Sequence, residues 1–175
     1  QRQRLAGPVQ QVAGALAIPR TELQAVAISV LNASSIVNGK SYLYALSGLT
    51  TNRKTSRAVE AAEVLAGGLL AAFVMRQDVN PFSSGYAAAA ANNAMIIAGG
   101  QQSQPDNKGS LTTIDGGRDD PPFLENWSSL ASLSMAPRYL MGSTVFGGFF
   151  YLVGGLTTGD VAAASTDLSV LGGTP

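Results

Sequence analysis

The stretch Phe149-Phe150-Tyr151-Leu152-Val153-Gly154-Gly155 follows Pro137-Arg138 along the chain. Its aromatic and β-branched residues stop at a pair of glycines, which predicts a buried strand ending in a tight turn. Two earlier stretches have the same form, Met95–Gly100 and Tyr42–Gly48, the second with serine in place of the first glycine. The pairs begin at residues 47, 99 and 154, so the spacings are 52 and 55 residues. A fixed period of this size indicates an array of structural repeats.

The residues around each of these strands repeat as well. We expect a first strand at 23–30, 86–91 and 140–146, and then a hairpin turn at Asn38-Gly39, Asn92-Asn93 and Gly147-Gly148. After the glycine-terminated second strand comes a polar loop, and then a third strand at 58–65, 110–115 and 165–171. Each third strand is predicted to end at another glycine pair, namely Gly67-Gly68, Gly116-Gly117 and Gly172-Gly173. A fourth strand, which includes Trp127 in the second copy, completes the unit.

The segment 58–75 tests this repeat, because its alanine, glutamate and leucine residues favour a helix. However, Gly67-Gly68 divides the segment, and its two halves align with strands of the other copies. Strand preference depends strongly on packing context. We therefore predict a β-hairpin that turns at Gly67-Gly68.

The motifs resemble those of kelch repeats, with Pro-Arg before the first strand, an aromatic residue before Gly-Gly and a tryptophan before the next repeat. The resemblance covers residues 9–173 and implies an all-β fold of kelch-type β-propeller blades, each a four-stranded antiparallel sheet. We expect one domain over residues 1–175, built from three repeats. Its parts are an N-terminal strand at 9–18, blade 1 at 20–80, blade 2 at 81–136, and blade 3 at 137–173, completed by the N-terminal strand.

Three blades do not close a ring, since propellers have about 4–8 blades. Two alternatives follow: the chain is part of a larger propeller, or several chains complete one together. An uncovered blade would expose apolar residues, and such patches mark interfaces. The residues expected at an interface are large aromatics, which carry much of the burial when proteins associate: Trp127, Phe146, Phe149 and Tyr151.

The composition limits the possible functions. Eleven basic and eleven acidic residues balance one another, so no charge field favours nucleic acid. The chain has no histidine and no cysteine, which rules out a catalytic triad built on either residue and removes the commonest metal ligand. No apolar run is long enough for a transmembrane helix. We expect no cofactor, and we expect an extracellular or cell-surface location, which the lack of cysteine favours.

Positively charged residues form the candidate binding positions. Arg20 and Arg138 occupy the same repeat position, where they could bind an anionic ligand or, alternatively, hold backbone carbonyls and tie one blade to the next. Arg53, Lys54 and Arg57 lie in a loop after the first glycine pair. Kelch-like proteins place loops of this class on their binding face, so the loop could recognise an acidic peptide or a sugar acid. The alternative is a solvated loop tip.

Two further candidates depend on loops. Asp115, Asp119 and Asp120 could supply oxygen ligands for Ca²⁺, although a plain charged turn is the alternative and the spacing is not that of an EF-hand. Asn32 begins an Asn-x-Ser glycosylation pattern in a predicted inserted loop. Glu60 and Glu63 lie on one predicted strand at a spacing that places them on opposite faces.

These features favour a non-enzymatic protein-binding or assembly module that belongs to a larger complex and has protein partners or associates with itself. The alternative is a carbohydrate-binding or carbohydrate-processing fragment of a kelch-type enzyme. We predict no catalytic residue.

Overall fold

The computed structural model describes residues 14–29, 39–76, 78–79, 84–91, 94–101, 113–120, 123–132 and 137–170. At 91, 94, 113–120, 123–126, 128–132 and 167–170 it describes the backbone only. Within these ranges the chain forms antiparallel strands and one short 3-10 turn, Ala66–Gly68. The predicted all-β class is therefore confirmed.

Sheet 1 has four strands in chain order: β1 (Gln24–Ser29), β2 (Ser41–Leu49), β3 (Thr55–Val64) and β4 (Val74–Arg76). The hairpin predicted over 58–75 is confirmed, because Val59 pairs with Arg76 and Ala61 pairs with Val74. Gly67 and Gly68 form its turn at φ angles of 75° and 80°, which favour glycine.

Sheet 2 also has four strands in chain order: β5 (Ala87–Ala91), β6 (Ala94–Ala98), β7 (Thr113–Asp120) and β8 (Phe123–Ser132). One expectation is wrong here, because β7 does not end at Gly116-Gly117. The strand continues through both glycines to Asp120, and its pairing with β8 shifts register on either side of them. The second glycine pairs of the first two repeats are therefore not structurally equivalent.

Sheet 3 has three strands in the described residues: β10 (Gly142–Phe146), β11 (Phe149–Val153) and β14 (Thr166–Val170). A small sheet lies at one end of it, formed by β9 (Arg138–Tyr139), β12 (Leu156–Thr157) and β13 (Val161–Ala162). Gly147 and Gly148 form the β10–β11 turn as predicted, with Phe146 opposite Phe149.

The predicted closing strand at 9–18 is not found in its described part. Residues 14–18 form no strand, and they lie against sheet 1, where the backbone N–H groups of Ala17 and Ile18 donate to Glu60 of β3. Residues 9–13 lie outside the described residues. Within the described part of the chain, β14 pairs with β11 alone.

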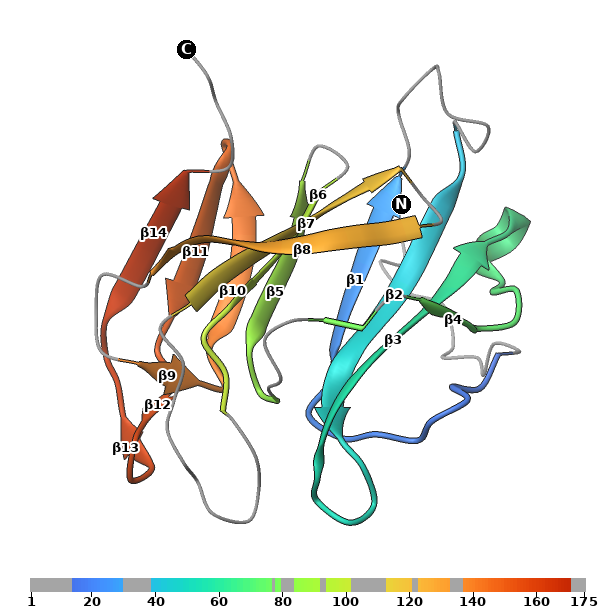
Figure 1. Ribbon diagram of the computed structural model, residues 1–175. Coiled ribbons are helices and arrows are strands. Elements are labelled where there is room, and N and C mark those ends of the chain that lie inside the picture. The colour runs from blue at the N-terminus through green and yellow to red at the C-terminus, as the bar shows by residue number, and fades with distance from the viewer. Residues whose placement is uncertain are drawn as a thin grey trace, which may run out of the picture.

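The three large sheets stand side by side through their first strands, with β1 next to β5 and β5 next to β10 (Figure 1). The later strands of each sheet extend outward from this row. We call the face of each sheet turned towards the next sheet in chain order its front, and the opposite face its back. Sheet 3 has no following sheet among the described residues, so we call its front the face whose residues match, by strand register, the front residues of sheets 1 and 2.

Two apolar cores fill the spaces between the sheets. The first joins the front of sheet 1 to the back of sheet 2, and its large side chains are Val26, Ile28, Tyr42, Tyr44, Tyr86, Met95 and Ile97. The second joins the front of sheet 2 to the back of sheet 3: Ala87, Ile96, Ala98, Met141, Phe150 and Leu152. Sheet 2 contributes to both cores, because alternate residues of a strand point to opposite faces.

Candidate functional site

The glycine-terminated second strands meet the turns that lead into the first strands at one end of the sheets, which we call the diglycine end (Figure 1). Each repeat joins these two segments with the same backbone bridge. The paired residues are Thr21 with Leu49, Ser84 with Gln101, and Tyr139 with Leu156. The bridge explains why the sequence repeats at these positions.

The glycine pairs have the same backbone geometry in all three repeats. Gly99 and Gly100 have φ angles of 65° and 99°, and Gly154 and Gly155 have 65° and 98°. Ser47 and Gly48 reproduce them at 51° and 108°. The serine therefore replaces the first glycine without changing the turn, and its hydroxyl donates to the carbonyl of Ser56 at 2.6 Å.

A second set of equivalent residues links the repeats to one another. Glu22, Gly85 and Leu140 all have left-handed φ angles, of 53°, 62° and 54°. The N–H of Gly85 donates to the carbonyl of Glu22 at 3.3 Å, and the N–H of Leu140 donates to the carbonyl of Gly85 at 2.5 Å. These hydrogen bonds hold the diglycine ends of the three sheets together.

A polar cluster lies at this end, around Tyr139. Its hydroxyl donates to a carboxylate oxygen of Asp160, and the side chain of Gln101 hydrogen-bonds the same tyrosine. Burial raises the pKa of Tyr139 to about 12, and the Asp160 carboxylate and the Glu22 charge add to this, while Gln101 opposes it. The cluster offers hydroxyl, amide and carboxylate groups from different repeats.

The raised pKa of Tyr139 predicts a loss of stability in alkali. Its folded pKa lies above the ordinary value of 10, so its contribution is complete below about pH 10 and is lost as the pH rises towards about 12. Tyr139→Phe should therefore flatten the fall of the urea midpoint between these pH values. Asp160→Asn removes the neighbouring charge and lowers the folded pKa, so the fall should still begin near pH 10 but should be smaller and end at a lower pH. An identical pH dependence in both variants and the wild type would contradict the assignment.

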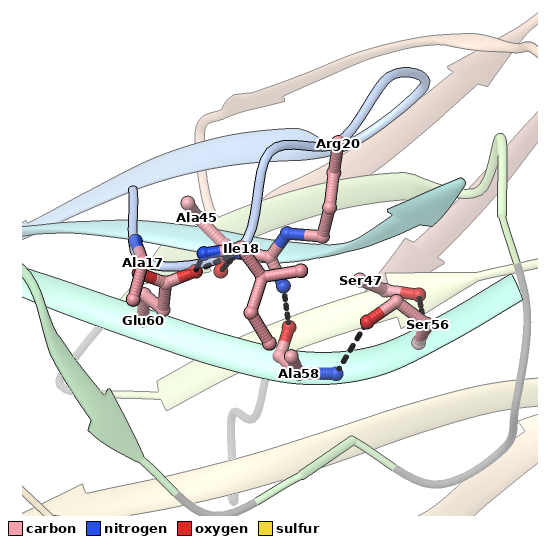
Figure 2. Close-up of polar contacts among 8 residues, drawn as sticks. All are labelled: Ala17, Ile18, Arg20, Ala45, Ser47, Ser56, Ala58 and Glu60. Atoms are coloured by element: carbon pink, nitrogen blue, oxygen red, sulfur yellow. Dashed lines mark hydrogen bonds and ion pairs between the residues drawn. The ribbon is translucent and has the colours of Figure 1, made fainter. Parts of the chain in front are cut away.

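Arg20 contacts groups of sheet 1. Its guanidinium and the Glu60 carboxylate are both fully buried and form an ion pair of 2.9 Å (Figure 2). The guanidinium also donates to the backbone carbonyl of Ala58 and, at 3.5 Å, to that of Ala45. Burial lowers the pKa of Arg20, and the Glu60 charge opposes that shift.

Arg138 holds sheet 3 in a similar way. Its guanidinium is buried and donates to the carbonyl of Gly154 at 3.1 Å and to the carbonyl and hydroxyl of Ser165 at 2.9 and 2.8 Å. Ser165 occupies the register position of Ala58 in sheet 1. Both arginines thus hold backbone carbonyls of their own sheets, as the alternative interpretation predicted, and the ligand role stays a prediction. These bonds therefore do not tie one blade to the next.

Glu60 is the buried residue that the sequence analysis left without a role. One of its oxygens accepts from the N–H of Ala17 at 2.6 Å, and the other accepts from Arg20 and from the N–H of Ile18 at 3.3 Å. Asp115 and Asp167 occupy the equivalent register positions on β7 and β14. An acidic residue therefore recurs at this position of the third strand in all three repeats, and this recurrence is the sequence pattern that could have marked Glu60 as a structural residue. Glu63, half-buried, pairs instead with exposed Lys40 at 2.9 Å.

The basic loop is shorter than predicted. Arg53 and Lys54 are exposed in a turn closed by the N–H of Arg53 donating to Thr50, whereas Arg57 lies in β3 and donates to the carbonyl of Val79 at 3.1 Å. The equivalent turn in the third repeat has Asp160 at the position of Arg53, with φ angles of 60° and 56°. The two turns thus present opposite charges at the diglycine end.

The calcium candidates do not form a loop. Asp115, Asp119 and Asp120 all lie in β7, paired with β8, and Asp115 also pairs with Ile97 of β6. The predicted flexible loop is wrong because the chain uses these residues as strand. Within the described ranges no three acidic, histidine or cysteine residues gather as metal ligands. Asn32 lies outside the described residues.

The four aromatic interface candidates differ in exposure. Trp127 packs half-buried against the core between sheets 1 and 2, so it belongs to an interface inside the chain. Phe146 is 75% exposed on the front of sheet 3. Phe149 and Tyr151 lie half-buried on the same face, with their ring centroids 6.3 Å apart. In the described part of the chain, no helix has the length and apolar character to cross a membrane.

Comparison with known proteins shows a likeness at the level of the fold. No protein-family model matches the sequence, and no curated protein does. The solved structure of YjhT superposes with a TM-score of 0.66 at 16% sequence identity, over 88% of this chain and 44% of that one. The fold is similar to that of YjhT. The chain spans less than half the length of YjhT.

Proposed function

We propose that the three sheets are kelch-type blades of a partial β-propeller, and that the chain is a non-enzymatic protein-binding or assembly module. The matching turns of the three repeats and the row of first strands support the blade assignment. The structural likeness to YjhT supports a propeller-like β fold. The propeller would be partial because three sheets are fewer than the about 4–8 blades of closed propellers. A charged fraction of only 13% supports burial of part of the surface against a partner. An extracellular or cell-surface complex is the setting we propose.

The front of sheet 3 carries this proposal. Tyr44 on the front of sheet 1 is fully buried by sheet 2, but Tyr151, at the same register position of sheet 3, is only half-buried. Ile28 is likewise 4% exposed, whereas its equivalent, Phe146, is 75% exposed. Covering a large apolar side chain contributes about 1.5–3 kcal/mol. A further sheet packed on this face would therefore be strongly stabilised.

The assembly proposal predicts that residue 146 becomes protected on association. Because the natural chain has no cysteine, Phe146→Cys provides a unique thiol on the front of sheet 3. Its rate of labelling by a maleimide should fall as protein concentration rises, because association covers the face. Val161→Cys is a matched control, since Val161 is 61% exposed but lies in the small end sheet.

Two results together would contradict the assembly proposal. The first is a labelling rate at residue 146 that equals the rate at residue 161 at every protein concentration. The second is that no hydrophobic dye binds to the wild type. Dye binding that is lost in Phe146→Asp would locate the apolar patch on this face. Circular dichroism should confirm that each variant keeps the wild-type strand content.

A second candidate function is carbohydrate binding at the diglycine end. The observation that favours it is the group of Tyr139, Gln101 and Asp160, which can donate to and accept from sugar hydroxyls. Saturation-transfer NMR with a panel of neutral and acidic sugars tests it. Binding should be lost in Asp160→Asn and retained in Phe146→Asp, whereas no transfer to any sugar would reject this function.

A further inference from the structure

The back of sheet 1 carries alanines at the positions where sheet 2 uses alanines to pack against the front of sheet 1. Ala88 and Ala90 of β5 lie on the back of sheet 2 and pack into the core formed with the front of sheet 1. By strand register, Ala25 and Ala27 of β1 occupy the equivalent positions in sheet 1. The chain therefore shows, within itself, what kind of surface fits an aromatic front face.

These two alanines are open to a partner. Ala25 and Ala27 are both exposed, and neighbouring Leu43 is half-buried. Residues 14–20 lie on a different part of the same face, where they bind Glu60 of β3, the third strand. In sheet 3, Arg138 likewise contacts the second and third strands and leaves the first strand, β10, uncovered. Sheet 2 packs on β10, where the hydroxyl of Ser143 donates to the carbonyl of Ala88 at 3.2 Å. Residues 14–20 thus leave β1 open to the packing of a further sheet.

The two ends of the row of sheets are complementary. The front of sheet 3 presents large residues, with Phe146 and Val153 exposed and Phe149 and Tyr151 half-buried, while the back of sheet 1 presents alanines on its inner strand. In the first core, Ala88 and Ala90 on the back of sheet 2 likewise pack against a front of large residues, beside Met95 and Ile97. In the second core the large residues, Phe150 and Leu152, lie on the back instead. A head-to-tail contact of this kind forms a closed ring when the rotation per copy divides a full turn.

We infer that the occupant of this face is a second copy of the same chain. The inference rests on the proposed function, and it adds that the front of sheet 3 of each copy packs on the back of sheet 1 of the other. Two copies supply six large sheets, within the range of about 4–8 blades that closed propellers use.

Analytical ultracentrifugation of the full 175-residue chain, with variants on each face, tests the inference. The wild type should sediment as a dimer of twice 17.9 kDa. Phe146→Asp on the front and Ala27→Arg on the back should each raise the dimer dissociation constant by more than about 30-fold. Both positions are exposed in the single chain, so folding should be retained. Thr144→Lys and Ala25→Arg serve as second variants of the two faces, and Val161→Asp is the control that should remain dimeric.

Mixing the front and back variants gives the sharpest result. Each pair of unlike copies retains one intact contact, so the mixture should form a dimer that neither variant forms alone. A dimer disrupted by Phe146→Asp but not by Ala27→Arg or Ala25→Arg would indicate front-to-front pairing and overturn the inference. Open oligomers larger than a dimer would overturn ring closure. If the wild type is a monomer and its dye binding depends on Phe146, the inference of a second copy is overturned but the proposed function is kept. If the wild type is a monomer that binds no dye, both are rejected.

Discussion

Glu60→Leu should lower the free energy of unfolding by about 3–5 kcal/mol, because it leaves a buried guanidinium without its counter-charge. The same change removes the acceptor for the N–H groups of Ala17 and Ile18, so residues 14–20 should detach from sheet 1. Urea unfolding followed by tryptophan fluorescence and circular dichroism measures the loss. Proteolysis near residue 16 should become faster in the variant.

Two further variants separate the charge effect from a packing effect. Glu63→Gln breaks the ion pair with Lys40, which is exposed, and should cost only about 0–1 kcal/mol. Arg20→Met combined with Glu60→Leu removes both buried charges and should recover much of the stability lost in the single variant. If Glu60→Leu were as mild as Glu63→Gln, the buried pair would not be holding the N-terminal segment.

Gly48→Ala should destabilise the protein on the order of 4 kcal/mol, because strain in the backbone and a steric clash act together. Gly48 has a φ of +108°, and an added Cβ would lie 2.5 Å from the carbonyl oxygen of Thr21 and 3.0 Å from the amide nitrogen of Leu23. Both are backbone atoms, and the Thr21 oxygen accepts from the N–H of Leu49 in the bridge, so it cannot move aside without breaking that hydrogen bond. Thermal unfolding by circular dichroism gives the measurement.

Gly39→Ala is the matched control for this clash. Gly39 also has a positive φ, of +80°, but nothing lies within 4 Å of an added Cβ. Gly39→Ala should therefore lower the free energy of unfolding only by the strain of a left-handed backbone at alanine, about 1–2 kcal/mol. Equal losses in the two variants would mean that the close approach at Gly48 contributes nothing.

The repeat made much of the fold predictable from sequence. The glycine pairs placed the second strands, and Ser47-Gly48 was recognised as an equivalent pair although it lacks the first glycine. Strand pairing over 58–75 prevailed over helix propensity, because the alanines of β3 are buried between a sheet neighbour and the core. In such a position packing contributes more than the intrinsic preference of the residue.

Other features depended on contacts that sequence spacing does not encode. The ion pair of Arg20 with Glu60 joins residues 40 positions apart, and the register of β3 rather than any local motif brings them together. Gly116-Gly117 lie inside a strand because bulges in its pairing with β8 accommodate them. The part of the expected closing strand that is described lies on sheet 1, where the hydrogen bonds to Glu60 hold it.

The alanine run of β5 has a consequence for how the chain unfolds. Ala87 to Ala90 put methyl groups into both cores, so the first strand of sheet 2 buries little apolar area of its own and packs against large residues of sheets 1 and 3. Losing either neighbouring sheet would expose one face of sheet 2. When neighbouring units of an array stabilise one another strongly, partly folded species are scarcely populated. Melting should then be a single calorimetric transition, with the van't Hoff enthalpy equal to the measured one.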